Sequence, residues 1–298
     1  MLINAAICNF ENNGGGDRAL WQRMHDKLAS LDLHLLLRQE VWNAQDDGNA
    51  LADAAEAVLG MAGLIGPECC TALYHDTNLF TPVGEFPKTG PMWVLPPTVR
   101  SLQLAGTAPG AVPLIVGSYH LNYGSTTTRL SEAERLTQWN DRWVKVDARR
   151  VHYPALLGGD NNSYPVPGTP GDPALPVLEE IPDEPHRAHR SYIGLDNVRR
   201  MDDRPDDTLR TAGLQDVARH LAITAGNTAA VAPTVDAYET HGPDSRIDRI
   251  YASKQLLPAV REVEVINMKG LSDHHTVVVR LDRDTLTNIL NNPISRTA

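Results

Sequence analysis

Residues 155–163 read ALLGGDNNS. Apolar residues and two glycines lead into an aspartate and two asparagines, which predicts a strand that ends in a polar loop. Alone, the Asp-Asn-Asn run would be an ordinary turn. The pattern recurs along the chain, however, because other apolar runs of strand length also end in acidic, amide or imidazole residues. These strand ends carry the predictions of both fold class and function.

Further strands are expected on both sides of this stretch. They cover residues 2–9, 33–38, 71–75, 99–105, 112–120, 246–253, 263–268 and 275–281. Helices are expected to begin at Asp17 and near Asn49. A third helix is expected to open at a capping box formed by Ser131 and Glu134 and to continue to Val146. Because helices are interspersed among more numerous strands, this order favours mixed sheets with helices on their outer faces.

The composition is that of a soluble globular protein, with 298 residues, 42% hydrophobic and 21% charged. It excludes the disordered, collagenous and miniprotein classes. Twenty-seven basic and 37 acidic residues give a net charge of -10. Because an acidic chain does not attract polyanions through its mean field, a phosphate-bearing substrate must meet a local patch or a bound cation.

The three cysteines do not form a disulfide pattern. They are Cys8 and the adjacent pair Cys69 and Cys70, and we expect all three to be reduced. The first residues lack the features of a signal peptide, and no apolar run has the length of a membrane span. The default expectation is therefore a cytoplasmic location without a membrane span.

Residues that can carry chemistry follow or lie within several expected strands. They are Asn9, Glu11, Glu40, His120, Asn122, Asp160, Asn162, Asp248, Asp273 and His274. A lone aspartate at a strand end is usually a turn residue or a helix cap, but loops at strand ends also converge on sites in folds of this kind. If the strand ends align, these carboxylates and two imidazoles share one pocket.

Such a cluster is costly without a counter-charge. Two carboxylates 4 Å apart repel by roughly 1 to 4 kcal/mol at effective dielectrics between those of water and a protein surface. A divalent cation removes that cost, and oxygen ligands from Glu, Asp and Asn select hard ions over zinc. The expected cofactor is Mg²⁺ or Mn²⁺, with Ca²⁺ as a further candidate. Imidazole and amide donors beside it suit a phosphoryl group, whose charge grows in the transition state.

Six short motifs together resemble the endonuclease/exonuclease/phosphatase superfamily. They are CNFE (8–11), RQEVW (38–42), SYHLNYGS (118–125), GGDNNS (158–163), RIDRIYAS (246–253) and LSDHH (271–275). The motifs occur in the family's order and span nearly the whole chain. The resemblance implies a single catalytic domain over residues 1–298. It also implies an α+β fold, a four-layer α/β/β/α sandwich of two mixed β-sheets packed face to face with helices outside.

The resemblance also implies roles for the first set of site residues. By it, Glu40 is the principal metal ligand, and Asn9 and Glu11 support the metal and the active site. His120 contacts the scissile phosphate, and Asn162 contacts a phosphate oxygen. Glu11 stands where many relatives carry Asp, so its carboxylate reaches one methylene further.

The remaining roles fall on the carboxylates and imidazole near the end of the chain and on Asp160. Asp160 matches the carboxylate that orients or activates the attacking water. Asp248 matches the carboxylate of the family's R-I-D-Y-I element. Asp273 and His274 match the terminal Asp–His pair, and Asp273 is also a candidate metal ligand. We expect Asp273 to orient His274, and His274 and Asp160 to handle protons.

The substrate is left open by the motifs, since the family cleaves DNA, RNA, lipid headgroups and inositol phosphates. Candidate phosphate contacts are Arg129, Arg187, Arg190, Arg199 and Arg200, each of which could equally be an ordinary solvated residue. Arg249 replaces the family's common Tyr and is expected either to contact a phosphate or to pair with an acid. The Pro-rich segment 163–191 is expected to be a surface loop, on the substrate side if it follows the GGDNN strand end directly.

The sequence therefore predicts a divalent-metal-dependent phosphodiester hydrolase, with a nuclease of DNA or RNA as the leading interpretation. The alternative is a phosphodiesterase or phosphatase of a small or lipid phosphoester, which the net charge of -10 mildly supports. A catalytically dead binding module disagrees with the intact set of six motifs. A serine hydrolase lacks support, because no G-x-S-x-G is present. No obligate protein partner is inferred.

Overall fold

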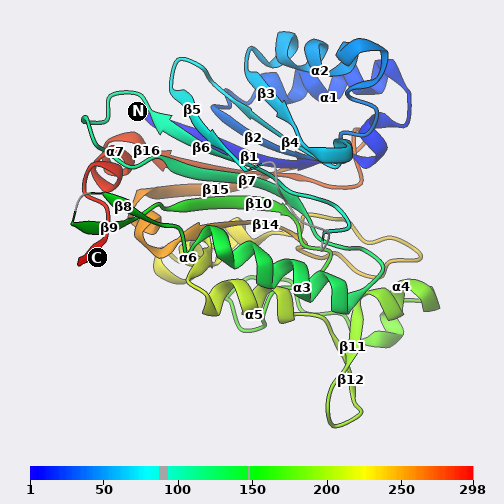
Figure 1. Ribbon diagram of the computed structural model, residues 1–298. Coiled ribbons are helices and arrows are strands. Elements are labelled where there is room, and N and C mark those ends of the chain that lie inside the picture. The colour runs from blue at the N-terminus through cyan, green and yellow to red at the C-terminus, as the bar shows by residue number, and fades with distance from the viewer. Residues whose placement is uncertain (87–92, 147, 298) are drawn as a thin grey trace.

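The computed structural model describes residues 1–86, 93–146 and 148–297. Two six-stranded mixed sheets pack face to face, and helices cover their outer sides (Figure 1). This arrangement confirms the predicted α+β sandwich. Parallel and antiparallel neighbours occur in both sheets, as expected when helices and hairpins both connect the strands.

The first sheet has the strand order β15-β16-β1-β2-β4-β3. Its strands are β1 (Leu2–Asn9), β2 (Leu35–Gln39), β3 (Ala62–Ile65), β4 (Thr71–His75), β15 (Val260–Ile266) and β16 (Thr276–Asp282). β1 runs parallel to β2 and antiparallel to β16. The first strand of the chain therefore pairs with a late strand in the middle of one sheet.

The second sheet has the strand order β13-β14-β10-β7-β6-β5. Its strands are β5 (Phe80–Glu85), β6 (Thr98–Leu104), β7 (Leu114–His120), β10 (Ala155–Asp160), β13 (Leu214–Asp216) and β14 (Asp248–Ser253). β10 runs parallel to β7 and antiparallel to β14. All residues of these three central strands are buried, because helices cover one face and the first sheet covers the other.

The helices lie on the two outer faces, and two small sheets add to the periphery. The helices are α1 (Arg18–Ala29), α2 (Asp46–Leu59), α3 (Thr126–Leu136), α4 (Glu184–His189), α5 (Arg204–Thr211), α6 (Val217–Thr224) and α7 (Arg283–Asn291). The small sheets are β11 (Ser191–Ile193) with β12 (Arg199–Met201), and β8 (Trp143–Val146) with β9 (Arg149–His152) and β17 (Ser295–Thr297). As predicted, the Asp17 side chain caps α1, accepting hydrogen bonds from two backbone N–H groups.

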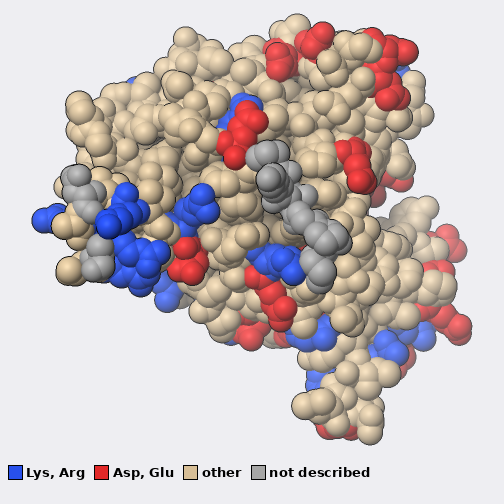
Figure 2. Space-filling view, in the orientation of Figure 1, with Lys and Arg blue, Asp and Glu red and all other residues tan. Residues whose placement is uncertain are grey.

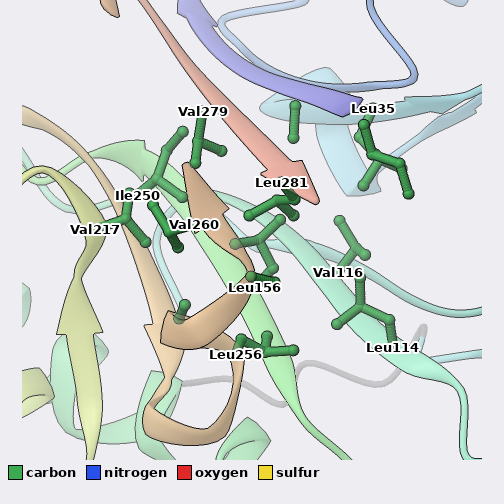
Figure 3. Packing of buried hydrophobic residues seen from close by; sticks show 14 of the residues in the cluster. Leu35, Leu114, Val116, Leu156, Val217, Ile250, Leu256, Val260, Val279 and Leu281 are labelled. Atoms are coloured by element: carbon green, nitrogen blue, oxygen red, sulfur yellow. The ribbon is translucent and has the colours of Figure 1, made fainter. Parts of the chain in front are cut away.

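The main core fills the space between the two large sheets (Figure 3). Side chains from β1, β2 and β16 meet those from β7, β10 and β14, and Leu35, Leu156 and Val279 are completely buried there. The two sheets lie close together at Gly158 of β10. A Cβ at that position would collide with the side chains of Ile7 and Leu37 on the opposite sheet. The glycine thus allows the end of β10 to lie close to the ends of β1 and β2.

Gly158→Ala is expected to lower the free energy of unfolding by about 1–3 kcal/mol, because the added methyl overpacks the space between the sheets. Gly124→Ala is a matched control, since a Cβ at Gly124 would meet no atom within 4 Å. Its stability is expected to stay within about 0.5 kcal/mol of the wild type. Urea denaturation of both variants measures the difference, and equal stabilities would contradict this account of the close approach.

The predicted helix from Ser131 to Val146 is wrong. The Ser125 hydroxyl caps α3 instead, so the helix begins at Thr126 and passes through Ser131. The helix ends at Leu136, and the residues from Trp143 to Val146 form β8, which pairs with β9. The loop after β7 sets the start of α3, because the side chain of Asn122 accepts a hydrogen bond from the backbone N–H of Ser125.

The expected state of the cysteines is confirmed. Cys8 and Cys70 are buried and Cys69 is half-buried, and all three are free thiols. Among the described residues, no helix combines the length and the apolar character that crossing a membrane requires.

Candidate active site

One edge of the sandwich gathers the predicted site residues. Asn9 ends β1, His120 ends β7 and Asp160 ends β10, and β14 begins at Asp248 because it runs antiparallel to β10. The register places Asp160 opposite His120 on one side and opposite Asp248 on the other. Face-to-face packing of the sheets then brings Asn9 to the same place.

Asp160 lies at the centre of this group. Its Oδ2 accepts a hydrogen bond from Nδ2 of Asn9 at 3.2 Å, and Nε2 of His120 is 3.5 Å from the same oxygen. Its Oδ1 accepts a hydrogen bond from the backbone N–H of Asn162 at 2.7 Å. Burial alone would raise the pKa of Asp160, but the hydrogen bond from His120 and the charge of His274 lower it below its usual range. Asp160 is therefore a carboxylate at neutral pH.

His274 is paired with Asp248. Its Nδ1 lies 2.8 Å from Oδ2 of Asp248, and its Nε2 lies 3.9 Å from Oδ2 of Asp160. Burial opposes protonation of His274, but the neighbouring carboxylates outweigh it, Asp248 most strongly, and raise its pKa to about 10. The ring is then an imidazolium that donates from Nδ1 to Asp248 and directs its Nε2–H towards Asp160.

The expectation that Asp273 orients His274 is wrong. Oδ2 of Asp273 is 4.0 Å from Nε2 of His274, and its side chain is 57% exposed. Asp248 holds the ring instead, and its own backbone N–H donates to Oγ1 of Thr234. The β14 carboxylate can take this role because it is buried and fixed at the start of a strand.

A second group of carboxylates borders the first. Glu11, Glu40 and Asp273 lie close enough that Asp273 raises the pKa of Glu11, with burial and Glu40 acting in the same direction. Oε2 of Glu40 accepts a hydrogen bond from the backbone N–H of Asn12 at 2.7 Å. Oδ1 of Asn9 is buried and has no hydrogen-bond partner among the described residues. Clustered carboxylates and an unpaired amide oxygen form a donor set that fits a hard divalent cation.

Three further ligand atoms could also surround an ion. Atoms of Asp160, Asp248 and His274 all lie within 4.8 Å of one another. The imidazolium between the two carboxylates already offsets part of their charge. The oxygen-only group around Glu40 is a second candidate for a hard cation, and the His274 group is also suited to moving or holding protons.

Two residues of the site have unusual backbone angles. Glu40 has a φ of 56° and Asn162 has a φ of 48°. Non-glycine residues in this left-handed region cost energy and often occur where the backbone must aim a functional side chain. Glu40 directly follows β2 and Asn162 lies two residues after β10, where the chain turns out of the sheet.

Several predicted phosphate contacts lie outside the site. Arg129 is completely buried and bonds Oδ2 of Asp202 through Nε and Nη2. Arg249 is also buried, donating to the Tyr251 hydroxyl and to the backbone oxygens of Ser163 and Arg246. Both arginines hold the loops behind the site together and cannot contact a substrate.

Three of the remaining arginines also make hydrogen bonds within the chain. Arg187 donates to the backbone oxygen of Ile181, Arg199 to the Ser191 hydroxyl and Arg200 to Asp196. Arg190 differs, because its Nη1 is buried and has no hydrogen-bond partner among the described residues. The Pro-rich segment 163–191 also differs from the expected bare loop, since it contains a 3₁₀ turn (Leu178–Glu180) and α4.

Supporting residues were missed by the sequence reasoning. The Thr234 hydroxyl accepts hydrogen bonds from the backbone N–H groups of Ile247 and Asp248. The Ser272 hydroxyl donates to the backbone oxygen of Asn9. Ser272 lies inside the LSDHH motif, so that motif could have indicated it, whereas no pattern in the sequence marks Thr234.

Solved structures with the same arrangement of strands and helices exist, although no family model and no curated protein matches the chain. An endonuclease/exonuclease/phosphatase family protein from Bacteroides thetaiotaomicron superposes with a TM-score of 0.60 and 17% identity, covering 94% of this chain and 95% of that one. An AP endonuclease from Archaeoglobus fulgidus gives a TM-score of 0.62 and 16% identity, covering 94% and 99%. The fold is the endonuclease/exonuclease/phosphatase fold. A 3'-5' exonuclease from Neisseria meningitidis shares it, with a TM-score of 0.60, 16% identity and coverage of 94% and 100%.

Proposed function

We propose that this protein is a divalent-metal-dependent phosphodiester hydrolase that cleaves nucleic acid, with residues 1–298 acting as one catalytic domain. The observation that carries the proposal is the convergence of Asp160 with the His274–Asp248 pair at one sheet edge. A carboxylate held ionised beside an imidazolium is suited to hydrolysis, because one can accept a proton while the other stabilises charge. The nuclease and phosphatase names among the structural neighbours support the same reaction class.

The reaction is in-line attack of water on phosphorus. Asp160 orients the water and accepts its proton as the new phosphorus–oxygen bond forms. The bond between phosphorus and the leaving oxygen breaks, and that oxygen takes a proton from solvent, to which Asp160 returns the proton that it accepted. His274 and His120 stabilise the charge that grows on the phosphoryl oxygens, whereas the Asn162 side chain is buried and donates to the backbone oxygen of Leu121. Burial of Asp160 and His120 strengthens these interactions by excluding water.

The residues that would bind the metal have a separate role in the reaction. Glu40, Asn9, Glu11 and Asp273 would hold Mg²⁺ or Mn²⁺, and the ion would neutralise negative charge on the phosphate as a Lewis acid. The buried, unpaired Oδ1 of Asn9 is the observation in its favour. The side-chain carboxylates of Glu11 and Asp273 are exposed, so the ion would remain open to substrate.

A small or lipid phosphodiester is the second candidate substrate, because the basic side chains lie elsewhere. In Figure 2 the largest group of Lys and Arg side chains lies near β8 and β9. Its exposed members are Arg142, Lys145, Arg149, Arg150 and Arg296. β9 leads into the amino end of β10, whereas the site lies at the carboxyl end of β10. Short substrates bound at the site therefore do not reach these cations.

Cleavage of short duplex DNA is consequently expected to depend only moderately on salt. With two or three phosphate contacts, a plot of log kcat/KM against log salt should have a slope of about -2 to -3. The measurement uses duplexes of ten base pairs between 50 and 200 mM KCl. A slope near -8 would show that an extended basic track binds the substrate and would contradict the charge argument.

A substrate panel tests the proposed function. Supercoiled plasmid, single-stranded DNA, RNA and bis(p-nitrophenyl) phosphate are each incubated with Mg²⁺ or Mn²⁺. Hydrolysis of a nucleic acid by the wild type and its loss in Asp160→Asn are the expected results. Hydrolysis of the small diester alone would favour the second candidate, and the absence of all hydrolysis would refute both.

A further inference from the structure

The exposed aromatic side chains of this protein lie in one place. All 3 Phe, 5 Trp and 8 Tyr fall within the described residues. Of these, only Tyr123 and Tyr238 are exposed, with 43% and 66% of their surface accessible. Exposed rings leave apolar surface in water, so two of them together at the edge of a site indicate a surface for a ligand.

Both tyrosines belong to loops that begin beside candidate catalytic residues. Tyr123 lies three residues after His120, at the end of β7. Tyr238 lies in the loop that follows Val235, and Val235 forms a β-bridge with His274. The two loops therefore leave the sheet edge from either side of the phosphate-handling groups.

Two histidines, one buried (His186) and one exposed (His241), connect the tyrosines into a continuous cluster. The Tyr123 hydroxyl is 3.0 Å from Nδ1 of His186, which lies in α4 and so comes from the segment that follows Asn162. The ring of His186 meets that of His241 edge-on, with centroids 3.8 Å apart, and His241 meets Tyr238 at 5.5 Å. We name these four residues, Tyr123, His186, Tyr238 and His241, the aromatic rim.

The electrostatics of the rim favour a flat, uncharged group with a phosphate attached. Burial and then the nearby charge of Arg190 lower the pKa of His186 to about 3 and also lower the pKa of His241. Both rings are therefore neutral, and His241 is exposed whereas His186 is buried beneath the tyrosines' loops. The Arg190 guanidinium lies 5.7 Å from the Tyr123 ring, and its Nη1 lacks a partner within the described chain.

We propose that the aromatic rim is a stacking subsite for the base of an unpaired nucleotide, with Arg190 attracting that nucleotide's phosphate. The inference rests on the proposed function and names its substrate class as single-stranded nucleic acid. A base in a duplex already has both faces covered by its neighbours, whereas an unpaired base has a free face for an aromatic side chain. The rim supplies aromatic surface and one cation, which is the combination that single-strand binding uses.

Two substrates of equal charge separate stacking from backbone binding. One is an oligonucleotide of eight thymidines, and the other is an eight-residue chain of abasic tetrahydrofuran spacers. Since stacking of one base on an aromatic side chain is worth about 5- to 150-fold in affinity, the wild type should prefer the thymidine chain by that range. Tyr238→Leu should raise KM for the thymidine chain by about tenfold and leave the spacer chain unchanged.

Tyr238→Phe is the matched control, because it keeps the ring, and no hydrogen bond of the Tyr238 hydroxyl occurs within the described residues. It should behave as the wild type on both substrates. Equal use of the two substrates by the wild type, or equal KM values for Tyr238→Leu and Tyr238→Phe, would overturn the subsite.

A binding measurement keeps the test independent of catalysis. The fluorescence of a single-stranded oligonucleotide containing 2-aminopurine falls when its base stacks on a ring. Wild type and Tyr238→Phe should quench it, and Tyr238→Leu should need at least about fivefold more protein for the same effect. Quenching without hydrolysis of any substrate would refute the proposed function and retain the subsite. Stronger binding of the matching duplex than of the single strand would overturn the subsite.

Discussion

His274→Gln is expected to lower kcat by about a thousandfold, the upper end of the range for loss of one group that stabilises transition-state charge. Glutamine keeps a hydrogen-bond donor of similar size but cannot carry the positive charge that the imidazolium holds between Asp248 and Asp160. The developing charge on the phosphoryl oxygens then loses its nearest cationic side chain. Steady-state kinetics on the best substrate of the panel measure the effect.

Loss of activity must be separated from loss of structure. His34→Ala is the control, because His34 is also buried but lies beyond the amino end of β2, where its Nδ1 accepts a hydrogen bond from the backbone of Asn4. It is expected to reduce the melting temperature and to leave kcat near the wild-type value. A well-folded His274→Gln enzyme with near-normal kcat would remove His274 from the mechanism and leave Asp160 to act without it.

The central strands could be predicted because a strand that is buried on both faces appears in the sequence as a continuous run of apolar residues. Residues 71–75 and 155–160 were predicted as strands, and they form β4 and β10 with the same bounds. Short peripheral strands such as β11 and β12 were not predicted, since three residues with mixed polarity carry no periodic signal. The third helix was misplaced because its capping residue was chosen from a local motif, while a loop contact fixed the true start.

The members of the candidate site could be predicted, but their pairing could not. Asp248 and His274 are 26 residues apart, and their hydrogen bond depends on how β14 and β16 are placed in different sheets. Because Asp273 and His274 are adjacent in the sequence, we expected Asp273 to be the partner of the His274 ring. The folded chain instead places Asp248 against that ring. The same limit applies to Arg249, whose two open roles could be separated only by its burial behind the site.

Removal of divalent metal is expected to reduce phosphodiester hydrolysis by at least about a thousandfold. A bound cation contributes several kcal/mol of charge stabilisation in the transition state, and each 1.4 kcal/mol corresponds to about tenfold in rate. Dialysis against excess chelator, followed by addition of Mg²⁺ or Mn²⁺, measures the loss and the recovery. Full activity of the metal-free protein in chelator would contradict the metal assignment.

The Glu40→Gln variant tests whether the metal binds at the group of carboxylates around Glu40. The change removes the charge of the proposed principal ligand at nearly constant volume, because an amide replaces the carboxylate that accepts a hydrogen bond from the Asn12 backbone. Because even outer-shell partners of metal ligands are worth about 10- to 100-fold in metal affinity, loss of Glu40 should raise the metal concentration for half-maximal activity by more than about a hundredfold. Glu85→Gln is the control, because Glu85 ends the edge strand β5 and forms an ion pair with Arg100 of β6. Equal metal dependence of the two variants would move the metal away from Glu40 and towards the cluster of Asp160, Asp248 and His274.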